Sequence, residues 1–307
     1  FLCVLNLGII KGEINMATLS KKNFSKFNDS GYLVLKNVLG ATEKKIIVKA
    51  FYAILSKYVK IDKNFSNLNF SNNSLHKKLI NFVKRNPKKF SDFYFELSLN
   101  ASLRSIFYSK KFINMFSKIL KTKKEFILIN GFMLRLDAPF DKRHTLPWHI
   151  DGAYYEQTDP FYNAGVCWMP LTNNSFDNGT VRFIPDSNNK SKVHPRNMKF
   201  TRKSKLASAV IEAPVSEKEK KSIKDVNASF GDAGIFHMLL KHKSGKNISK
   251  KFRLTLICRF HDISKKLNIG KELYMYTKTN NLAFNKNLKR TAATFHSPHQ
   301  ARLLKFS

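Results

Sequence analysis

One stretch of the chain, LLKHKSGKNISKKFR (residues 239–253), predicts a strand, a tight turn and a second strand. Apolar residues lead into His242, the following Ser-Gly-Lys-Asn is typical turn sequence, and the next strand begins near Arg253. The turn reverses the chain, so it should bring the arginine back beside the histidine. We therefore expect an imidazole and a guanidinium to face one site from neighbouring strands.

A second polar pair lies in WHID, residues 148–151. On an extended strand, side chains two positions apart share a face, so His149 and Asp151 should project together. Two histidines and one carboxylate form the facial triad that holds Fe(II) and leaves other coordination positions open. An HxD pair alone is weak evidence, because an ordinary strand end can have the same sequence. Combined with His242, it predicts an iron centre of His149, Asp151 and His242.

The residues after His242 favour it over the other nearby histidine, His237. The two are five positions apart and would face opposite ways on a regular strand. A guanidinium at Arg253 can bind the distal carboxylate of 2-oxoglutarate as a two-pronged pair, while the oxoacid end of that molecule chelates iron. Ser244 can add a hydroxyl group to the same carboxylate.

The surrounding sequence predicts a mainly β protein with helical additions. Residues 19–120 are mainly helical, with helices expected at 46–59, 75–83 and 103–119 and a short strand at 31–35. Beyond residue 124, short apolar runs separated by turns suggest an antiparallel jelly roll, the double-stranded β-helix. These runs are 126–136, 148–155, 164–171, 180–184, 207–213, 234–240 and 252–260.

We expect one catalytic domain over residues 16–307. It divides into a helical part at about 16–124, a jelly-roll core at about 125–262 and a C-terminal extension at 263–307. Residues 1–10 are apolar but have no basic region or cleavage site of a signal peptide. Lys-Gly-Glu before Met16 could be a ribosome-binding site read through as protein, so we expect residues 1–15 to be a non-native leader.

The formal charge of +34 raises the question of a nucleic-acid partner. Only 11 of the 55 basic residues are arginine, the side chain better suited to bidentate phosphate recognition. The surplus is also spread along the chain, so no specific nucleic-acid partner is expected. Three cysteines without a CxxC pair suit a reducing cytoplasm, and no run reaches the roughly 20 apolar residues that span a bilayer.

Over residues 23–262 the chain resembles the phytanoyl-CoA dioxygenase family of Fe(II)/2-oxoglutarate oxygenases, which also contains ectoine hydroxylases. It departs from the usual pattern at Ile150, where many members have glutamine, and at Asp186 and Asn188, where glycine and histidine are usual. The similar features are Phe27–Leu35 with Gly31-Tyr32, the HxD pair, Trp168–Leu171, Asn178-Gly179, Ile184–Ser187 and the H-x-S-x-x-N-x-S-x-x-x-R block at 242–253.

The resemblance implies a cupin-like jelly roll that uses Fe(II), 2-oxoglutarate and O2. It further implies hydroxylation of an unactivated C–H bond in a small molecule, with release of succinate and CO2. Tyr154, Tyr155 and Arg135 could line the substrate pocket, although strand aromatics are more often core and Arg135 could lie on the surface. Two other hypotheses remain: a nucleic-acid-binding protein, with or without oxidative demethylation, and a jelly-roll metal-binding protein without catalysis.

Overall fold

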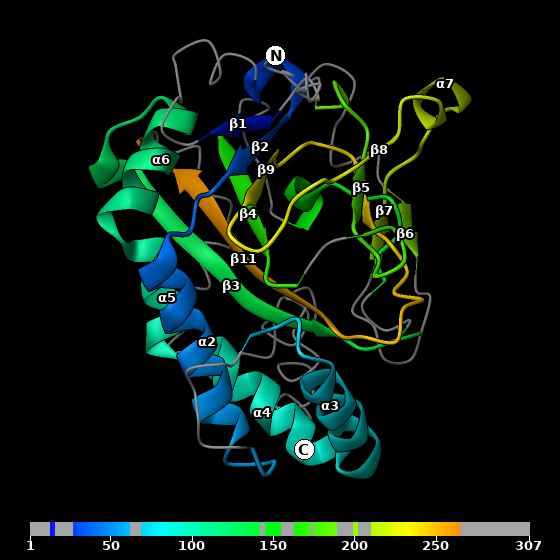
Figure 1. Cartoon of the computed structure of the whole chain (residues 1–307). Coiled ribbons are helices and arrows are strands. Elements are labelled where there is room, and N and C mark those ends of the chain that lie inside the picture. The colour runs from blue at the N-terminus through cyan, green and yellow to red at the C-terminus, as the bar shows by residue number, and fades with distance from the viewer. Residues whose placement is uncertain are drawn as a thin grey trace, which may run out of the picture.

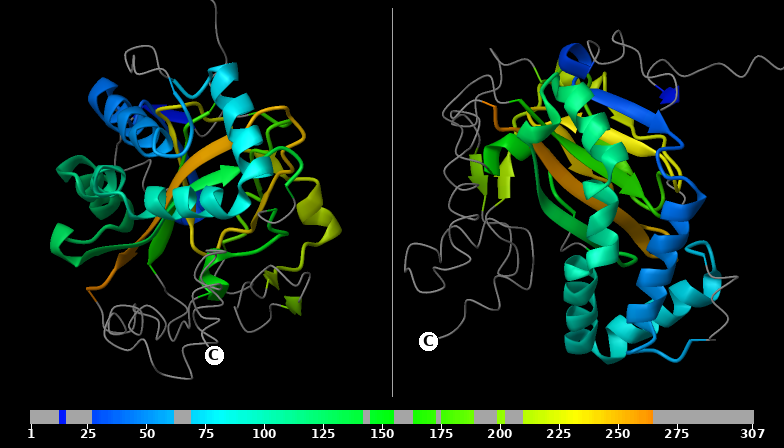
Figure 2. Two further views of the ribbon diagram at one scale, coloured as in Figure 1. Left: turned by 90° about the horizontal axis from the view of Figure 1, so that it is seen from below. Right: turned by 90° about the vertical axis from the view of Figure 1, so that its left-hand side faces the viewer.

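The computed structural model describes residues 13–15, 27–61, 69–141, 145–154, 163–172, 175–188, 199–201 and 210–264. In this part of the chain, a layer of helices covers one face of a six-stranded sheet, and a three-stranded sheet packs on the other face (Figures 1 and 2). The expected mainly β jelly roll with N-terminal helices is confirmed.

The helical layer comes from one continuous stretch between the second and third strands. It contains α2 (Ala41–Leu55), α3 (Asn73–Arg85), α4 (Pro87–Leu99), α5 (Ala101–Tyr108) and α6 (Lys110–Leu120). The prediction of one helix at 103–119 was wrong, because Ser109 is extended and its side chain accepts a hydrogen bond from Phe112 N, which starts α6. Helix α4, which begins at Pro87, was not among the three helices expected within this mainly helical stretch.

The larger sheet has the order β1-β2-β9-β4-β11-β3, and the smaller sheet has the order β10-β5-β8. A separate hairpin joins β6 to β7. The bounds are β1 (Glu13–Asn15), β2 (Tyr32–Lys36), β3 (Ile127–Asp137), β4 (Ala164–Pro170), β5 (Val181–Phe183), β6 (Lys199–Thr201), β7 (Val210–Glu212), β8 (Lys224–Asp225), β9 (Ala233–His237), β10 (His242–Ser244) and β11 (Arg253–Asp262), with short helices η3 (Lys124–Phe126), η4 (Asp151–Tyr154) and α7 (Glu217–Lys220).

Strand β11 separates the helical core from the space between the two sheets. Leu254, Leu256, Cys258 and Phe260 belong to the core beneath the helices. Ile257 belongs to the cluster between the sheets. Because successive side chains alternate, the odd-numbered residues of β11, from Arg253 to His261, face the space between the sheets. This face of the strand is therefore available for a site.

Some expected elements differ in the structure. The run 148–155 is not a regular strand: His149 makes one bridge to His242, and the chain then turns into η4. In the run 207–213, residues 210–212 form β7, and 207–209 lie outside the described residues. Residues 13–15, within the expected leader, pair with β2 as an edge strand. The leader and the domain bounds stay predictions. None of the described helices is both long and apolar enough to cross a membrane.

Candidate metal centre and cosubstrate site

The three predicted iron ligands come together between the sheets. The backbones of His149 and His242 exchange two hydrogen bonds of 2.9 Å, and their rings lie 4.2 Å apart between centroids. Asp151 begins η4, and its Oδ1 lies 3.8 Å from His149 Nε2. Within the described residues this buried trio can hold a metal ion, since one ligand atom from each lies within 4.8 Å of the others.

Backbone carbonyls fix the orientation of both histidine rings. Nδ1 of His149 lies 2.8 Å from the carbonyl oxygen of Pro147, and Nδ1 of His242 lies 2.9 Å from that of Leu240. A carbonyl oxygen only accepts, so each Nδ1 carries the proton and each Nε2 keeps its lone pair for a metal. His237 is engaged differently, because its Nδ1 accepts a hydrogen bond from Leu239 N at 3.1 Å.

The carboxylate of the trio is held in its charged form. Burial by itself raises the pKa of Asp151, but the charge of Arg259 and the electrostatic interactions with His242 and His149 outweigh burial and hold that pKa well below its usual range. Arg259 Nη2 also donates a hydrogen bond to Asp151 Oδ1 at 3.3 Å. The site thus presents two imidazoles and one carboxylate, which are ligands that suit Fe(II).

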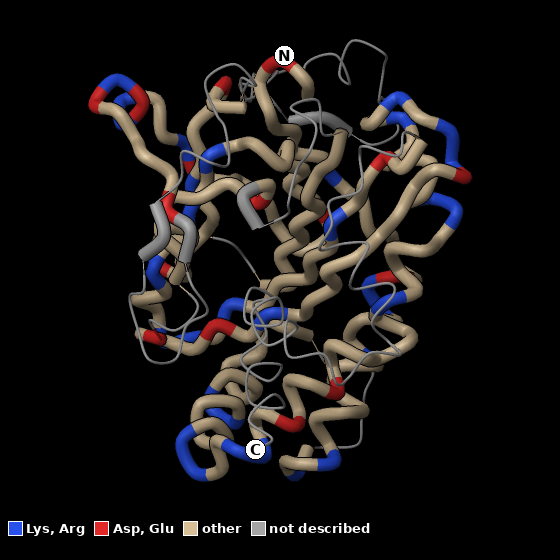
Figure 3. The backbone as a smooth tube through the Cα atoms, turned by 180° about the vertical axis from the view of Figure 1, so that it is seen from behind, with Lys and Arg blue, Asp and Glu red and all other residues tan. Residues whose placement is uncertain are grey.

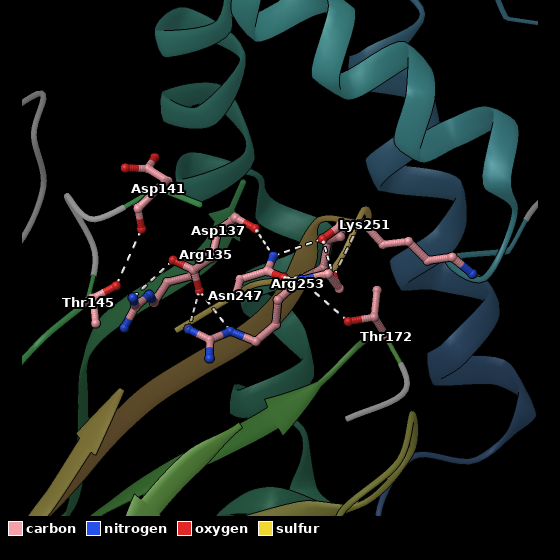
Figure 4. Close-up of polar contacts among 10 residues, drawn as sticks. Arg135, Asp137, Asp141, Thr145, Thr172, Asn247, Lys251 and Arg253 are labelled. Atoms are coloured by element: carbon pink, nitrogen blue, oxygen red, sulfur yellow. Dashed lines mark hydrogen bonds and ion pairs between the residues drawn. The ribbon is translucent and has the colours of Figure 1, made fainter. Parts of the chain in front are cut away.

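A second buried cluster lies at the other end of β11 (Figure 4). Arg253 donates from Nε and Nη2 to Asp137 Oδ2, at 3.0 and 2.6 Å. Arg135 Nη2 donates to the other oxygen, Oδ1, at 3.0 Å. Two guanidinium groups thus converge on one carboxylate inside this cluster. Positive charge of this kind stabilises a further carboxylate that comes close to it.

Two buried polar atoms show where that anion fits. Arg253 Nη1 and Thr255 Oγ1 are both buried, and neither has a hydrogen-bond partner among the described residues. Both residues lie on the face of β11 that points between the sheets. Ser244, two residues after His242 on β10, is also buried. A carboxylate such as the distal group of 2-oxoglutarate would satisfy these donors, so the residues fit the expected cosubstrate.

The profile of the family described as Phytanoyl-CoA dioxygenase (PhyH) matches residues 27–255. The chain belongs to this family. It is therefore a 2-oxoglutarate-dependent non-haem iron oxygenase, as the sequence resemblance implied. No curated protein matched the chain in the sequence comparison.

Solved structures share the fold of this family member at low sequence identity. EctD from S. alaskensis with bound Fe is 16% identical, with a TM-score of 0.53 over 80% of this chain and 78% of its own. EvdO2 from Micromonospora carbonacea var. aurantiaca, complexed with 2-oxoglutarate, is 14% identical, with a TM-score of 0.52 over 80% and 91%. The epimerase SnoN from nogalamycin biosynthesis is 14% identical, with a TM-score of 0.51 over 79% and 80%. At these identities the similarity establishes the jelly-roll fold.

Asn247, Gly179 and Gly245 give the turn after His242 its shape. They lie in the segments that resemble the family, but the sequence did not predict this structural role. Asn247 Nδ2 donates to the carbonyl oxygens of Asp137 and Lys251, at 3.0 and 2.8 Å. Gly179 and Gly245 pack backbone to backbone, since a Cβ on Gly245 would lie 2.5 Å from Thr180 O. The Asn178-Gly179 loop thus holds the turn that carries the chain from His242 to Arg253.

The loop where this chain departs from the family pattern keeps a structural role. Asp186 has φ of 60°, the left-handed conformation that glycine favours and that aspartate tolerates better than most residues. Next to it, the Ser187 hydroxyl accepts a hydrogen bond from Lys241 N at 2.9 Å. Asn188 donates to Asn28 O and lies against Gly31. The loop therefore links the start of the jelly roll to the backbone beside His242.

The three expected substrate residues have different outcomes. Arg135 is partly buried, with its side chain 14% exposed, and contacts Asp137. Tyr154 ends η4, three residues after Asp151, and Tyr155 lies outside the described residues. Asp137 and Arg259 were not predicted, because their partners Arg253 and Asp151 lie more than a hundred positions away in the sequence. The register of β3 and β11 places Asp137 opposite Arg253, and the packing of η4 against β11 places Asp151 beside Arg259.

Proposed function

We propose that this family member hydroxylates an unactivated C–H bond of a small molecule, with 2-oxoglutarate converted to succinate and CO2. The observation that supports this most is the joint presence of two sites between the sheets. The buried trio of His149, Asp151 and His242 offers three ligands, and Arg253 offers a buried, unsatisfied Nη1 on the same side of β11.

In this proposal the protein supplies geometry, charge and a dry environment. When bound, Fe(II) with 2-oxoglutarate and O2 supplies the oxidising power for the C–H bond. His149, Asp151 and His242 would hold the metal by one face and leave the other face for cosubstrate and O2. Arg253, with Thr255 and Ser244, would bind the distal carboxylate and so set the direction in which the oxoacid end points.

The positions of the charged side chains between the two sheets support this division of roles. Arg253 and Arg135 both contact Asp137 at the cosubstrate end, and the buried Nη1 of Arg253 remains as a donor for an anion. We keep Arg135 as a candidate for the substrate or cosubstrate pocket, since its side chain is 14% exposed and lies opposite Thr255 on β11. Tyr154 and Tyr155 follow the metal carboxylate in sequence and remain our candidates for substrate contact.

The test is 2-oxoglutarate turnover by the purified protein supplied with Fe(II) and O2. The parent should form succinate, and Asp151→Ala should abolish this because a ligand is lost. Asp225→Ala is the matched control, since Asp225 pairs with Arg182 on the exposed smaller sheet and should leave turnover unchanged. A folded, iron-supplied parent that forms no succinate with any substrate offered would contradict the proposal.

The chemical outcome is tested by product mass. Hydroxylation adds one oxygen atom to a substrate that stimulates succinate formation, and labelled O2 should deliver that atom. The solved structure of SnoN is described as an epimerase, so this fold also accommodates other outcomes. A substrate that stimulates succinate formation but does not change in mass would overturn the hydroxylation proposal. The assignment to the oxygenase class would still hold.

A further inference from the structure

Arg259 is neither one of the three expected metal ligands nor part of the cosubstrate cluster. It lies on the same face of β11 as Arg253, six positions further along the strand. At the rise of a strand, roughly 3.3 Å per residue, the two Cα atoms are about 20 Å apart. Arg253 therefore serves the cosubstrate cluster, and Arg259 reaches the metal trio from the opposite end of the strand.

The contact of Arg259 with the trio is direct and buried. Its Nη2 lies 3.3 Å from Asp151 Oδ1, and the two side chains are 11% and 5% exposed. Oδ1 is also the carboxylate oxygen that lies 3.8 Å from His149 Nε2. A guanidinium is always charged, and a charge-assisted hydrogen bond in a buried place is little screened by solvent. The orientation of the Asp151 carboxylate therefore depends on Arg259.

A bulge in the neighbouring strand makes room for this side chain. Along β3 and β11, Ile257 pairs with Met133 but Arg259 pairs with Asn130, so β3 has one extra residue opposite Cys258. Gly131 lies in that bulge with φ of 57°, a conformation that favours glycine. A Cβ on Gly131 would lie 2.7 Å from Arg259 Nη1. The glycine thus provides both the backbone shape and the space that the guanidinium occupies.

We propose that Arg259 is a positioning residue of the metal centre, which holds the Asp151 carboxylate in the orientation of a metal ligand, and that the Gly131 bulge places it there. This inference rests on the proposed function. It extends that function because Arg259 on β11 and Gly131 on β3, which are not metal ligands, gain a role at the metal centre. Groups that orient metal ligands typically contribute 10- to 100-fold to metal affinity.

The experiment measures Co(II) affinity by calorimetry and the visible d–d spectrum of the bound Co(II), on the full chain without cosubstrate. Arg259→Leu should bind Co(II) about 10- to 100-fold more weakly than the parent and shift the spectrum. Arg259→Lys should recover part of the affinity and of the spectrum, because a cation returns. Arg85→Leu is the control: it removes an exposed arginine at the end of α3, and it should change neither the affinity nor the spectrum.

A double-mutant cycle tests the bulge. Gly131→Ala should weaken Co(II) binding in the presence of Arg259, because the new methyl group displaces the guanidinium. In the Arg259→Leu background, the same change should produce no further loss. If Arg259→Leu fails to fold, Arg259→Lys and Gly131→Ala still test the assignment.

Parent-like Co(II) affinity and spectrum in folded Arg259→Leu would overturn the inference. Independent, additive losses in the cycle would overturn the role of the bulge. A folded parent that binds no Co(II) would instead refute the metal centre and with it the proposed function, so the two failures are distinguishable.

Discussion

Replacement of Asp137 by asparagine tests whether this carboxylate holds two buried guanidinium groups together. The Asp137 side chain is 6% exposed, and those of Arg253 and Arg135 are 4% and 14% exposed. Removing one partner of a buried ion pair typically costs about 3–5 kcal/mol, because the other charge stays buried without compensation. Since a domain of this kind is stable by about 5–15 kcal/mol, Asp137→Asn should lower the free energy of unfolding by a large fraction.

The assay is urea unfolding of the metal-free protein, followed by thermal melts with added Co(II) and 2-oxoglutarate. Asp225→Asn is the matched control: it also pairs with an arginine, at 2.8 Å, but its side chain is 40% exposed. The control should lose at most about 1 kcal/mol. The dianion of 2-oxoglutarate should restore part of the loss in Asp137→Asn, because it brings a new carboxylate to Arg253.

Equal, small losses in the two variants would refute the reasoning, because they would show that Arg253 and Arg135 do not depend on Asp137. If Asp137→Asn does not fold, Asp137→Glu keeps the charge and should fold with a smaller loss.

Three further predictions concern the turn, a buried histidine and the metal. Gly245→Ala should destabilise the fold by about 1–3 kcal/mol in urea, because its Cβ meets backbone atoms that cannot swing aside; an unchanged midpoint would contradict the packing. Burial, and then Arg259, lower the pKa of His261 from 6.5 to about 3. The unfolded chain therefore binds this proton first, and stability should fall as pH drops from about 6.5 toward 3. His261→Gln should flatten this dependence of the urea midpoint, and an identical slope would argue against it. Chelation should lower the melting temperature, and Co(II) should raise it again. At a hundredfold excess of Co(II) over Kd, binding should stabilise the folded protein by about 2.7 kcal/mol, and the melting temperature of Asp151→Ala should not respond to Co(II).

The local patterns in the sequence predicted most of the fold and all three members of the metal trio. The turn sequence after His242 predicted that Arg253 begins the following strand, as it does, because turn chemistry acts over neighbouring residues. The two strands are not neighbours, however, since β10 lies in the smaller sheet and β11 in the larger one. The HxD pair converged for a different reason from the one predicted: Asp151 begins a short helix, so the strand alternation invoked for His149 and Asp151 does not apply.

The rest depended on contacts that no local pattern reveals. Asp137 meets Arg253 because the two residues lie opposite each other in the register of β3 and β11. Arg259 meets Asp151 because β11 and η4 come together, although the two residues are 108 positions apart in the sequence. The bulge at Gly131 leaves space for the Arg259 guanidinium, and an isolated sequence does not predict where such an extra residue is placed. The break at Ser109 between α5 and α6 is similar, since a capping serine resembles any other helix serine.

The hypothesis of a nucleic-acid-binding protein makes a separate prediction. Basic positions occur on helices, loops and strands alike, with acidic positions among them (Figure 3). A diffuse lysine surface should bind duplex DNA weakly and without sequence preference, and the affinity should fall steeply with salt. Tight binding at physiological salt would require a basic groove and would favour that hypothesis.

The central claim is that the His149, Asp151 and His242 trio binds iron while Arg253 binds the cosubstrate. The most direct measurement is anaerobic titration of the purified protein with Fe(II) and 2-oxoglutarate, followed by the weak visible charge-transfer band of the chelated complex. We predict a band in the parent and in the control Arg85→Ala, which loses an exposed arginine on α3, and a weaker band in Arg253→Ala at equal 2-oxoglutarate. No band in the folded, iron-supplied parent, or an undiminished band in Arg253→Ala, would contradict the claim.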